Sequence, residues 1–382
     1  MRFKQLRPVG HPIICQRSNQ NPAECFSPCK VNFYASGTAA LAAAISAAIT
    51  AHQNARPEII LPAYACPSLV SAILFNGAKP VLVDLAPKQI SLDLPALKNQ
   101  LTERTAAVIT VDLFGLPSVT PQLREIVRAS GAYLIHDCAQ ATPSPTRLTT
   151  IEDELVVLSF GRGKPVSILN GGAILRSPNN PFSLPASPAI QIPSWTTNVQ
   201  TNIKYRLYNL MIKPHVYWLI DYLPINVGDT RFNPLKKTGG ISPTALQYLA
   251  INLHHASTRE QRLRNHYAQL GGTLSGQGWI DLCQGADPLH QNTLLRYAML
   301  APSQAIRDDH LLKMAKLGLG VTSLYQHPLP DIADMPNVLQ PTTRFPNAST
   351  FSKRLLTIPI HDHVDSGSIN TISKVLSYSQ LT

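Results

Sequence analysis

Short apolar runs recur along the first 175 residues, separated by longer amphipathic stretches. The runs do not alternate between apolar and polar positions, and each is too short for a free-standing helix, as expected of strands buried on both faces. The stretches between them are long enough to form crossover helices. This rhythm predicts an α/β fold with a mostly parallel, doubly wound sheet. The predicted strands are 58–63, 80–84, 106–112, 132–137, 155–160 and 172–176, and the predicted helices are 39–51, 67–76 and 121–130.

The rhythm breaks after residue 177, and 205–227 is the most apolar and aromatic stretch of the chain. A span of a bilayer needs about 20 nearly uncharged residues, whereas this stretch contains Arg206, Lys213, His215 and Asp221. Pro214 breaks any continuous helix there. We therefore expect a hairpin of two short helices that packs in the core or at a subunit interface of a dimer. A patch that lies on a membrane surface is the alternative.

The last third of the chain has a different pattern, typical of a small α+β domain. We predict one long amphipathic helix over 242–270, strands at 296–302, 318–324 and 355–360, and a closing helix at 368–377. A chain of 382 residues is long enough for two domains. The predicted division is a large domain over 1–238, with an apolar insert at about 195–235, and a small C-terminal domain over 239–382.

Composition narrows the classes of function. The chain is 44% hydrophobic and 14% charged, which excludes a disordered protein and a coiled coil. The net charge of +11 permits anionic partners, but the longest cationic run is Lys236-Lys237 and no nucleic-acid-binding spacing occurs. No nucleic-acid partner is expected. Residues 1–10 carry charges without an apolar segment, so no secretory signal is predicted and the expected location is the cytoplasm.

Six cysteines are expected to be free thiols in such a chain. Cys25 and Cys29, with Cys15 nearby, could supply three zinc ligands, but a matching second pair is missing. No metal site is therefore predicted.

Polar residues stand where the predicted strands end. Asp137 closes one strand, Ser159 closes the next, and Lys164 follows in a loop rich in glycine. Ligands of open α/β sheets bind outside the carboxyl ends of the strands, and the helix that starts at Ser36-Gly37-Thr38 offers an N-terminus that favours a phosphate. An amine, a carboxylate and an anion site are the groups that pyridoxal phosphate requires. The combination predicts this cofactor.

At these residues the sequence resembles the DegT/StrS family of sugar aminotransferases, which are fold-type I pyridoxal-phosphate enzymes. The spacing from Asp137 through Gln140 to Ser159 and Lys164 is specific to that family. The segments that carry the resemblance are SGTAAL (36–41), LPAYACPSLVSAILFNGAKPVLVDL (61–85), TERTAAVITVDLFG (102–115), LIHDCAQA (134–141), LSFGRGK (158–164), NGGAIL (170–175), ISPTALQYLAINLHHASTREQR (241–262) and RLLTIPIHDHV (354–364).

The resemblance implies a role for each matching residue. Lys164 would form the Schiff base with the cofactor and move the proton, and Asp137 would pair with the pyridine nitrogen. The other implied cofactor contacts are Gly37, Thr38 and Ser159 at the phosphate, Gln140 near the ring, and Cys66, which stands where family members often place an aromatic side chain. Tyr64, Arg162 and His327 are the residues predicted to contact the substrate.

The family also implies a reaction and a partner. Its members transfer an amino group, usually from glutamate, to a keto group on a nucleotide-linked sugar. They are typically homodimers whose subunits complete each other's sites. The expected partners of this chain are thus a small amino donor, a keto acceptor and a second copy of itself.

Two alternatives remain open at the level of the sequence. One keeps the cofactor but changes the reaction to dehydration or carbon–carbon bond formation on a non-sugar substrate. The sugar dehydratases of the family carry His at the lysine position, so Lys164 favours transamination. The other is a catalytically silent scaffold on the same fold, against which the intact Lys164 and Asp137 speak.

Overall fold

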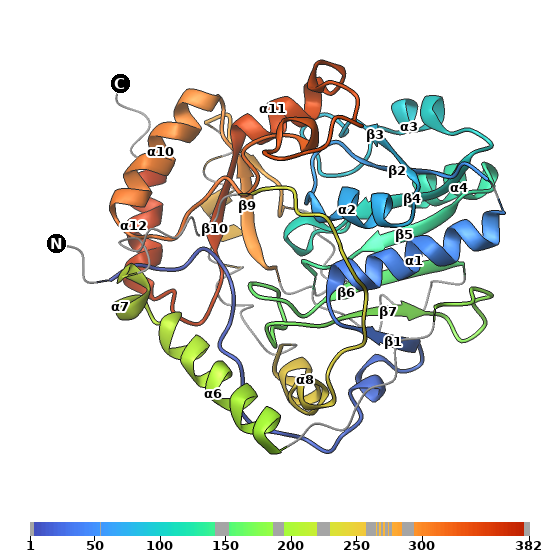
Figure 1. Cartoon of the computed structure of the whole chain (residues 1–382). Coiled ribbons are helices and arrows are strands. Elements are labelled where there is room, and N and C mark those ends of the chain that lie inside the picture. The colour runs from blue at the N-terminus through green and yellow to red at the C-terminus, as the bar shows by residue number, and fades with distance from the viewer. Residues whose placement is uncertain are drawn as a thin grey trace.

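The computed structural model describes residues 4–53, 55–141, 153–185, 195–219, 230–256, 277–284 and 294–377, together with 265, 267, 268, 270, 271 and 274. At its centre is a seven-stranded sheet in the order β1-β7-β6-β5-β4-β2-β3 (Figure 1). Strands β2 to β6 pair in parallel, and β7 is antiparallel to both of its neighbours. The strands are β1 (Lys30–Tyr34), β2 (Glu58–Pro62), β3 (Lys79–Val83), β4 (Thr105–Val111), β5 (Tyr133–Asp137), β6 (Glu154–Ser159) and β7 (Gly172–Arg176).

The predicted mostly parallel, doubly wound sheet is confirmed, and so are the six strands predicted for it. Strand β1 was missed because its sequence, KVNFY, mixes polar with apolar positions. It lies at the edge of the sheet and is only partly buried, so that its sequence does not need a continuous apolar run.

Helices cover both faces of this sheet (Figure 1). Side chains on alternate positions of a strand point to opposite faces; accordingly, Ile59 belongs to the same core cluster as helix α1, while Ile60 packs with helices α3 and α4. The layer beside Ile59 contains α1 (Gly37–His52) and α2 (Ser68–Phe75). The opposite layer contains α3 (Leu94–Gln100), α4 (Pro121–Ala129) and α8 (Pro243–Ala256).

The C-terminal part is built on an antiparallel sheet in the order β10-β9-β8. Its elements are β8 (Ile280–Asp281), β9 (Arg296–Leu300), α10 (Gln304–Lys316), α11 (Pro346–Arg354), β10 (Leu355–Pro359) and α12 (Ser366–Ser377). Short 3₁₀ helices lie at Pro22–Phe26, Leu113–Gly115, Leu329–Asp331 and Thr342–Arg344. The strands predicted at 296–302 and 355–360 and the closing helix are confirmed.

The strand predicted at 318–324 is wrong. Only Thr322 pairs there, in an isolated bridge with Thr357. Gly318 and Gly320 have φ angles of 70° and 67°, a left-handed backbone that turns the chain and prevents extended pairing. Only glycine fits at position 320, because a side chain there would also place its Cβ 2.6 Å from the Arg7 carbonyl oxygen.

Two other predictions, the helix over 242–270 and the division of the chain at residue 238, are not fully tested by the described residues. The helix predicted over 242–270 begins as α8 and ends at Ala256, beyond which most of the range lies outside the described residues. Helix α8 packs against the large sheet through Ala245, Tyr248 and Leu249. The division of the chain at residue 238 stays a prediction.

The apolar insert forms α6 (Trp195–Met211) and α7 (Pro214–Tyr217). As predicted, no continuous helix passes through Pro214, because proline removes a helix hydrogen bond and fits only in the first turn of a helix. Residues 220–227 of the predicted stretch lie outside the described residues. In the described part of the chain, no helix has the length and apolar character needed to cross a bilayer.

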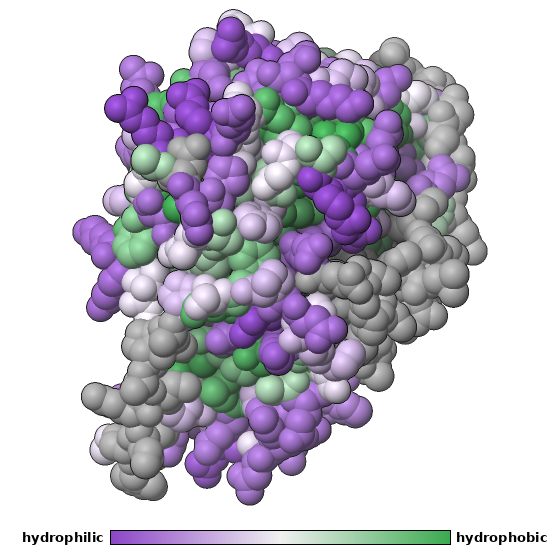
Figure 2. Space-filling model, turned by 90° about the vertical axis from the view of Figure 1, so that its right-hand side faces the viewer, coloured by the Kyte–Doolittle hydropathy of each residue, from purple (hydrophilic) through white to green (hydrophobic). Residues whose placement is uncertain are grey.

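The surface beside α3 and α4 contrasts with the insert. Figure 2 shows this side of the molecule, where hydrophobic side chains lie in recesses between hydrophilic ones. Scattered apolar surface of this kind is normal for a folded protein.

The N-terminal segment ties α6 to the C-terminal part through a buried arginine. Arg7 is only 2% exposed, and its guanidinium donates to the carbonyl oxygens of Gly10 and Ile212. Its own carbonyl oxygen accepts from Nε2 of His361 at 2.9 Å, while Nδ1 of His361 accepts from the backbone N–H of His363. This pattern uses the neutral imidazole, because protonation of Nδ1 would remove the acceptor. Burial and the nearby Arg7 charge hold the pKa of His361 well below its usual value.

We expect the protein to lose stability in acid through His361. Because His361 binds a proton less readily in the folded state than in the unfolded state, the free energy of unfolding does not depend on this group above its unfolded pKa of about 6.5. Below that pH the free energy of unfolding decreases by up to about 1.4 kcal/mol per pH unit. His361→Gln keeps an N–H donor and removes the titration. Urea unfolding between about pH 8 and about pH 5 should show a flatter pH dependence for this variant. The exposed His327 supplies the control His327→Gln, and an equal flattening in both variants would contradict the assignment.

Candidate active site

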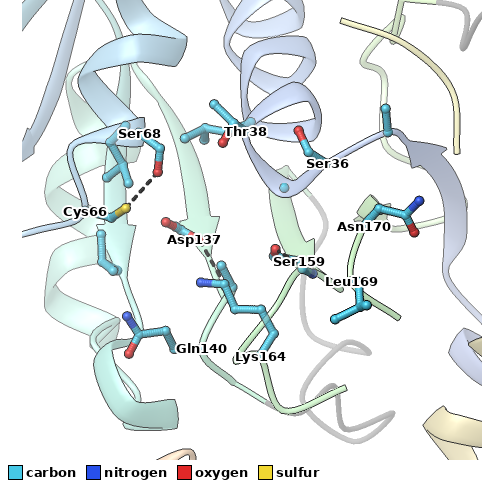
Figure 3. A pocket seen from close by; sticks show the side chains of 18 residues that line it. Ser36, Thr38, Cys66, Ser68, Asp137, Gln140, Ser159, Lys164, Leu169 and Asn170 are labelled. Carbon is cyan, nitrogen blue, oxygen red and sulfur yellow. Dashed lines mark hydrogen bonds between the residues drawn. The ribbon is translucent and has the colours of Figure 1, made fainter. Parts of the chain in front are cut away.

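A cavity of about 350 Å³ opens at the carboxyl ends of β5 and β6, beside the N-terminus of α1 (Figure 3). Its volume suits a small-molecule ligand, and its place is where open α/β sheets bind ligands. Every residue predicted to bind the cofactor lines it: Gly37, Thr38, Cys66, Asp137, Gln140, Ser159 and Lys164. The remaining polar lining consists of Ser36, Ser68 and Asn170.

One end of the cavity is a junction of three backbones that only glycine permits. A side chain at Gly37 would place its Cβ 2.6 Å from Cβ of Ser159, and one at Gly172 would lie 2.6 Å from the Gly37 nitrogen. The side chain of Ser36 caps α1 by accepting from the N–H of Ala39 at 3.1 Å. The first N–H groups of a helix have no acceptor within it and attract anions. Together with the Ser159 hydroxyl, they form a cradle suited to a phosphate.

Asp137 is a buried carboxylate at the end of β5 and is 7% exposed. Its Oδ1 accepts from the backbone N–H of Ala139 at 3.0 Å. Burial raises the pKa of this carboxyl, against the opposing effects of the Lys164 charge and the Ala139 N–H. An ionised carboxylate is costly in such a place unless a cation or a strong donor faces it. The cavity therefore favours a ligand with a positively charged or protonated nitrogen.

Lys164 brings an amine to the same cavity from the loop after β6. The loop turns at Gly163, which has a φ of 73°, and the backbone N–H of Lys164 donates to the Gly161 carbonyl oxygen at 3.3 Å. Figure 3 shows the lysine side chain beside Asp137 and between Ser159 and Gln140. A nucleophilic amine and a buried carboxylate thus face one ligand space.

Gln140 connects three parts of the chain at the cavity wall. Its Oε1 accepts from the backbone N–H of Phe114 at 2.9 Å, and its Nε2 donates to the Tyr325 hydroxyl at 3.3 Å. Phe114 has a φ of 62°, a left-handed conformation that is rare for a large side chain. Gln140 therefore connects the ends of β4 and β5 to the turn after α10 that carries Tyr325.

Cys66 lines the wall opposite Asn170, and its thiol shares a 2.8 Å hydrogen bond with the Ser68 hydroxyl. Figure 3 draws this contact. Of the described residues that line the cavity, none is aromatic. A ligand ring would therefore contact small and aliphatic side chains, which leave more room over its face than an aromatic residue would.

The three predicted substrate contacts lie elsewhere. Tyr64 is fully buried, its hydroxyl donates to the Tyr325 carbonyl oxygen at 2.9 Å, and its ring packs against Phe351. Arg162 is exposed beside the cavity without lining it. His327 is exposed and lines two other surface pockets. A substrate role for these three residues stays a prediction.

Among the residues that line the cavity, Ser68 and Leu169 were not predicted from the sequence. Ser68 could have been found, because it opens a helix directly after Cys66-Pro67. The contact of Gln140 with Tyr325, which does not line the cavity, was not predicted either, because the two residues lie 185 positions apart and no spacing signal links them. Leu169, with a φ of 63°, lines the cavity in a strained backbone conformation that the sequence does not reveal.

The cysteines show no sign of a second centre. All six are free thiols, as predicted. Burial raises the pKa of Cys15, Cys25 and Cys29, which makes each a poorer thiolate. Within the described ranges, no three His, Cys, Asp or Glu side chains are grouped so that they could hold a metal ion.

Both curated sequences and solved structures are similar to this chain. UDP-N-acetyl-3-dehydro-α-D-glucosamine 3-aminotransferase from Acidithiobacillus ferrooxidans is 35% identical over 107 residues, which is 28% of each chain. The chain thus matches less than a third of the length of this curated relative.

Two solved structures share the fold over nearly the whole chain. DesV from S. venezuelae, solved in complex with a ketimine intermediate, has a TM-score of 0.66 and 20% identity over 93% of this chain and 86% of its own. NtdA from Bacillus subtilis, solved with bound PMP, has a TM-score of 0.65 and 17% identity over 95% of this chain and 78% of its own. At these identities the likeness shows the fold alone.

The sequence model of the DegT/DnrJ/EryC1/StrS aminotransferase family matches residues 31–180. This range contains the α1 cradle, Asp137, Ser159 and Lys164, and so the chemical centre of the cavity. Over these residues, which make up less than half of the chain, the sequence is similar to the DegT/DnrJ/EryC1/StrS aminotransferase family.

Proposed function

We propose that the chain is a pyridoxal-phosphate-dependent aminotransferase that moves an amino group, supplied by glutamate, to the keto group of a nucleotide-linked sugar. The observation that carries the proposal is the meeting of Lys164 and the buried Asp137 in one cavity with an anion cradle at its end. Neither an isolated loop lysine nor an isolated strand-end aspartate would support it.

The residues present fit this cofactor. The phosphate would be held by the N–H groups of Gly37 and Thr38 and by the Ser159 hydroxyl, since all three residues line the cavity. Asp137 would face the pyridine nitrogen, and a protonated nitrogen there offsets the cost of burying the carboxylate. Lys164 is the amine available to bind the aldehyde.

When bound, pyridoxal phosphate draws electrons from the carbon that carries the amino group. The chain's own residues determine where protons go. Lys164 Nζ would accept a proton from the substrate carbon and donate it back, since the loop after β6 brings this amine into the cavity. Asp137 would keep the pyridine nitrogen protonated, and the aliphatic walls at Leu41, Leu69 and Val111 would limit the access of water to the space around it.

The keto-sugar acceptor is supported by the similarity of 107 residues to an aminotransferase of a nucleotide-linked dehydro sugar. The net charge of +11 suits a substrate that carries a diphosphate. Retention of Lys164 favours transamination over the dehydration alternative.

We further propose that the protein works in the cytoplasm as a homodimer with shared active sites. Asn170 is exposed although it lines the cavity. The cavity is therefore open to the surface on that side, where a second subunit could complete its wall.

Reduction with borohydride tests the proposal most directly. The purified protein should be yellow, borohydride should bleach it, and peptide mapping should find the pyridoxyl group on Lys164. Addition of glutamate before reduction should prevent the labelling and release 2-oxoglutarate. Lys164→Ala should remain folded and colourless, because a half-buried loop lysine contributes little to the core. A label on Lys236 or Lys237 would refute the assignment.

Asp137→Asn should separate catalysis from stability. Because burial raises the pKa of Asp137, its ionised form costs folding free energy above that pKa. The cofactor-free variant should therefore be at least as stable as the wild type at neutral pH, by thermal unfolding. Its kcat should fall by about 100-fold or more, as for other electrostatic catalytic groups. Near-normal kcat would mean that the cofactor nitrogen is held by another group.

Gly37→Ala should weaken cofactor binding through the cradle. The added methyl would lie 2.6 Å from Cβ of Ser159, so that α1 must shift away from β6. We expect at least about a tenfold rise in the Kd for pyridoxal phosphate, since displaced donors bind a phosphate poorly. Gly367→Ala is the matched control, because Gly367 also lies in the first turn of a helix, α12, and an added Cβ there would meet only Oδ1 of Asp365 at 3.7 Å, an ordinary contact distance. Equal Kd values in the two variants would show that the phosphate lies elsewhere.

A further inference from the structure

Helix α6 has an apolar side toward the protein and a second apolar side toward solvent. The inner side is held by Tyr205, which is 2% exposed and packs edge-on against Tyr248 at 5.0 Å, and by the side chain of Asn209, which bonds to both backbone groups of Ile13. Ile212 extends this inner side and is 5% exposed. The helix is thus fixed to the body of the protein without using its outer side.

The outer side carries a stripe of large apolar residues, which we call the α6 stripe. Among the residues that the structure describes, its members are far more exposed than apolar side chains usually are: Val199 37%, Ile203 60%, Leu207 54%, Leu210 48% and Met211 39%. Their spacing of three and four residues places them on one face. Helix α6 lies at the outer edge of the molecule in Figure 1, so this face is accessible to a large, flat partner.

Cations border the stripe. With 3.6 residues per turn, Lys204 and Arg206 lie on its two flanks, and both are exposed. Lys213 continues the border after the helix ends. The sequence from Trp195 to Leu219 contains no aspartate or glutamate. An apolar face flanked by basic residues is the pattern of helices that lie in the interface of an anionic membrane.

The charge pattern disfavours a second copy of the chain as the occupant. In an isologous contact, the same patch faces itself across a twofold axis. Contact through the α6 stripe would then bring the cationic borders of two copies together, with no acid of α6 or α7 to pair with them. Like charges opposed across an interface are costly. Anionic lipid headgroups would instead pair with the same cations.

We propose that the α6 stripe docks the protein on the surface of a membrane that contains anionic lipid. The stripe enters the boundary between headgroups and acyl chains, while Lys204, Arg206 and Lys213 contact the headgroups. The helix lies in the plane of the membrane and does not cross it. The proposal is independent of the reaction that the cavity catalyses.

Sedimentation with vesicles tests the proposal on the full-length protein. Vesicles of phosphatidylcholine with phosphatidylserine should bind it, whereas vesicles of phosphatidylcholine alone should bind it at least about tenfold less. Raising the salt from about 0.1 M to about 0.5 M should weaken binding, because it shortens the range of the headgroup charges. Ile203→Gln with Leu207→Gln, and separately Lys204→Glu with Arg206→Glu, should each lower binding by about tenfold or more.

Matched controls change the same chemistry elsewhere. Leu312→Gln with Leu317→Gln alters two leucines on and beside α10 that are 56% and 50% exposed. Lys98→Glu with Arg128→Glu makes the same change in net charge on α3 and α4. Circular dichroism confirms that each variant is folded. Both controls should bind vesicles as the wild type does.

Two outcomes would overturn the proposal. One is the absence of binding to either kind of vesicle, or equal loss of binding in the stripe variants and their controls. The other is a wild-type dimer, by light scattering, that becomes a monomer in Ile203→Gln with Leu207→Gln and does not bind vesicles. That result would assign the α6 stripe to self-association.

Discussion

The close approach of α1 to the end of β6 is the constraint on which the site depends. Gly37 and Gly172 leave no side chain between the two backbones, and Ser159 fills the space that remains. The helix N-terminus therefore points into the cavity at the height of the strand ends, where Asp137 and Lys164 also arrive. A wider spacing would bury the same elements equally well but would separate the anion cradle from the amine and the carboxylate.

The small side chains of α1 allow this close approach to the sheet. Nine of its sixteen residues are buried, and most of these are alanines. Small side chains let the helix lie close to the sheet while they retain strong helix propensity. The core thus supports the geometry of the site, and the buried Asp137 adds a local cost that the ligand's nitrogen would offset. The contact between α1 and the sheet thus both stabilises the core and positions the N-terminus of α1 at the cavity.

A second dependence links the two parts of the chain. Gln140 reaches Tyr325, the Tyr64 ring packs on Tyr325, and the buried Arg7 joins the N-terminal segment to His361. These contacts are largely buried, and the hydrogen bonds among them no longer stabilise the structure if a partner moves. The wall of the cavity is consequently sensitive to the placement of the C-terminal part, although that part contributes no residue to the lining in the described structure.

Much of this protein follows from the sequence itself. Continuous apolar runs predict central strands because both faces of such strands are buried, and the polar residue that ends each run falls at the ligand-binding edge of the sheet, as Asp137 and Ser159 do. These signals are local. The edge strand β1, the turn at Gly318 and Gly320, the burial of Tyr64, and the contact of Gln140 with Tyr325 depend on residues far apart in the chain. Whether the apolar residues of α6 face inward or outward likewise depends on which side Tyr205 and Asn209 attach to the body. Periodicity gives the faces of a helix, but only tertiary packing selects the one that is buried.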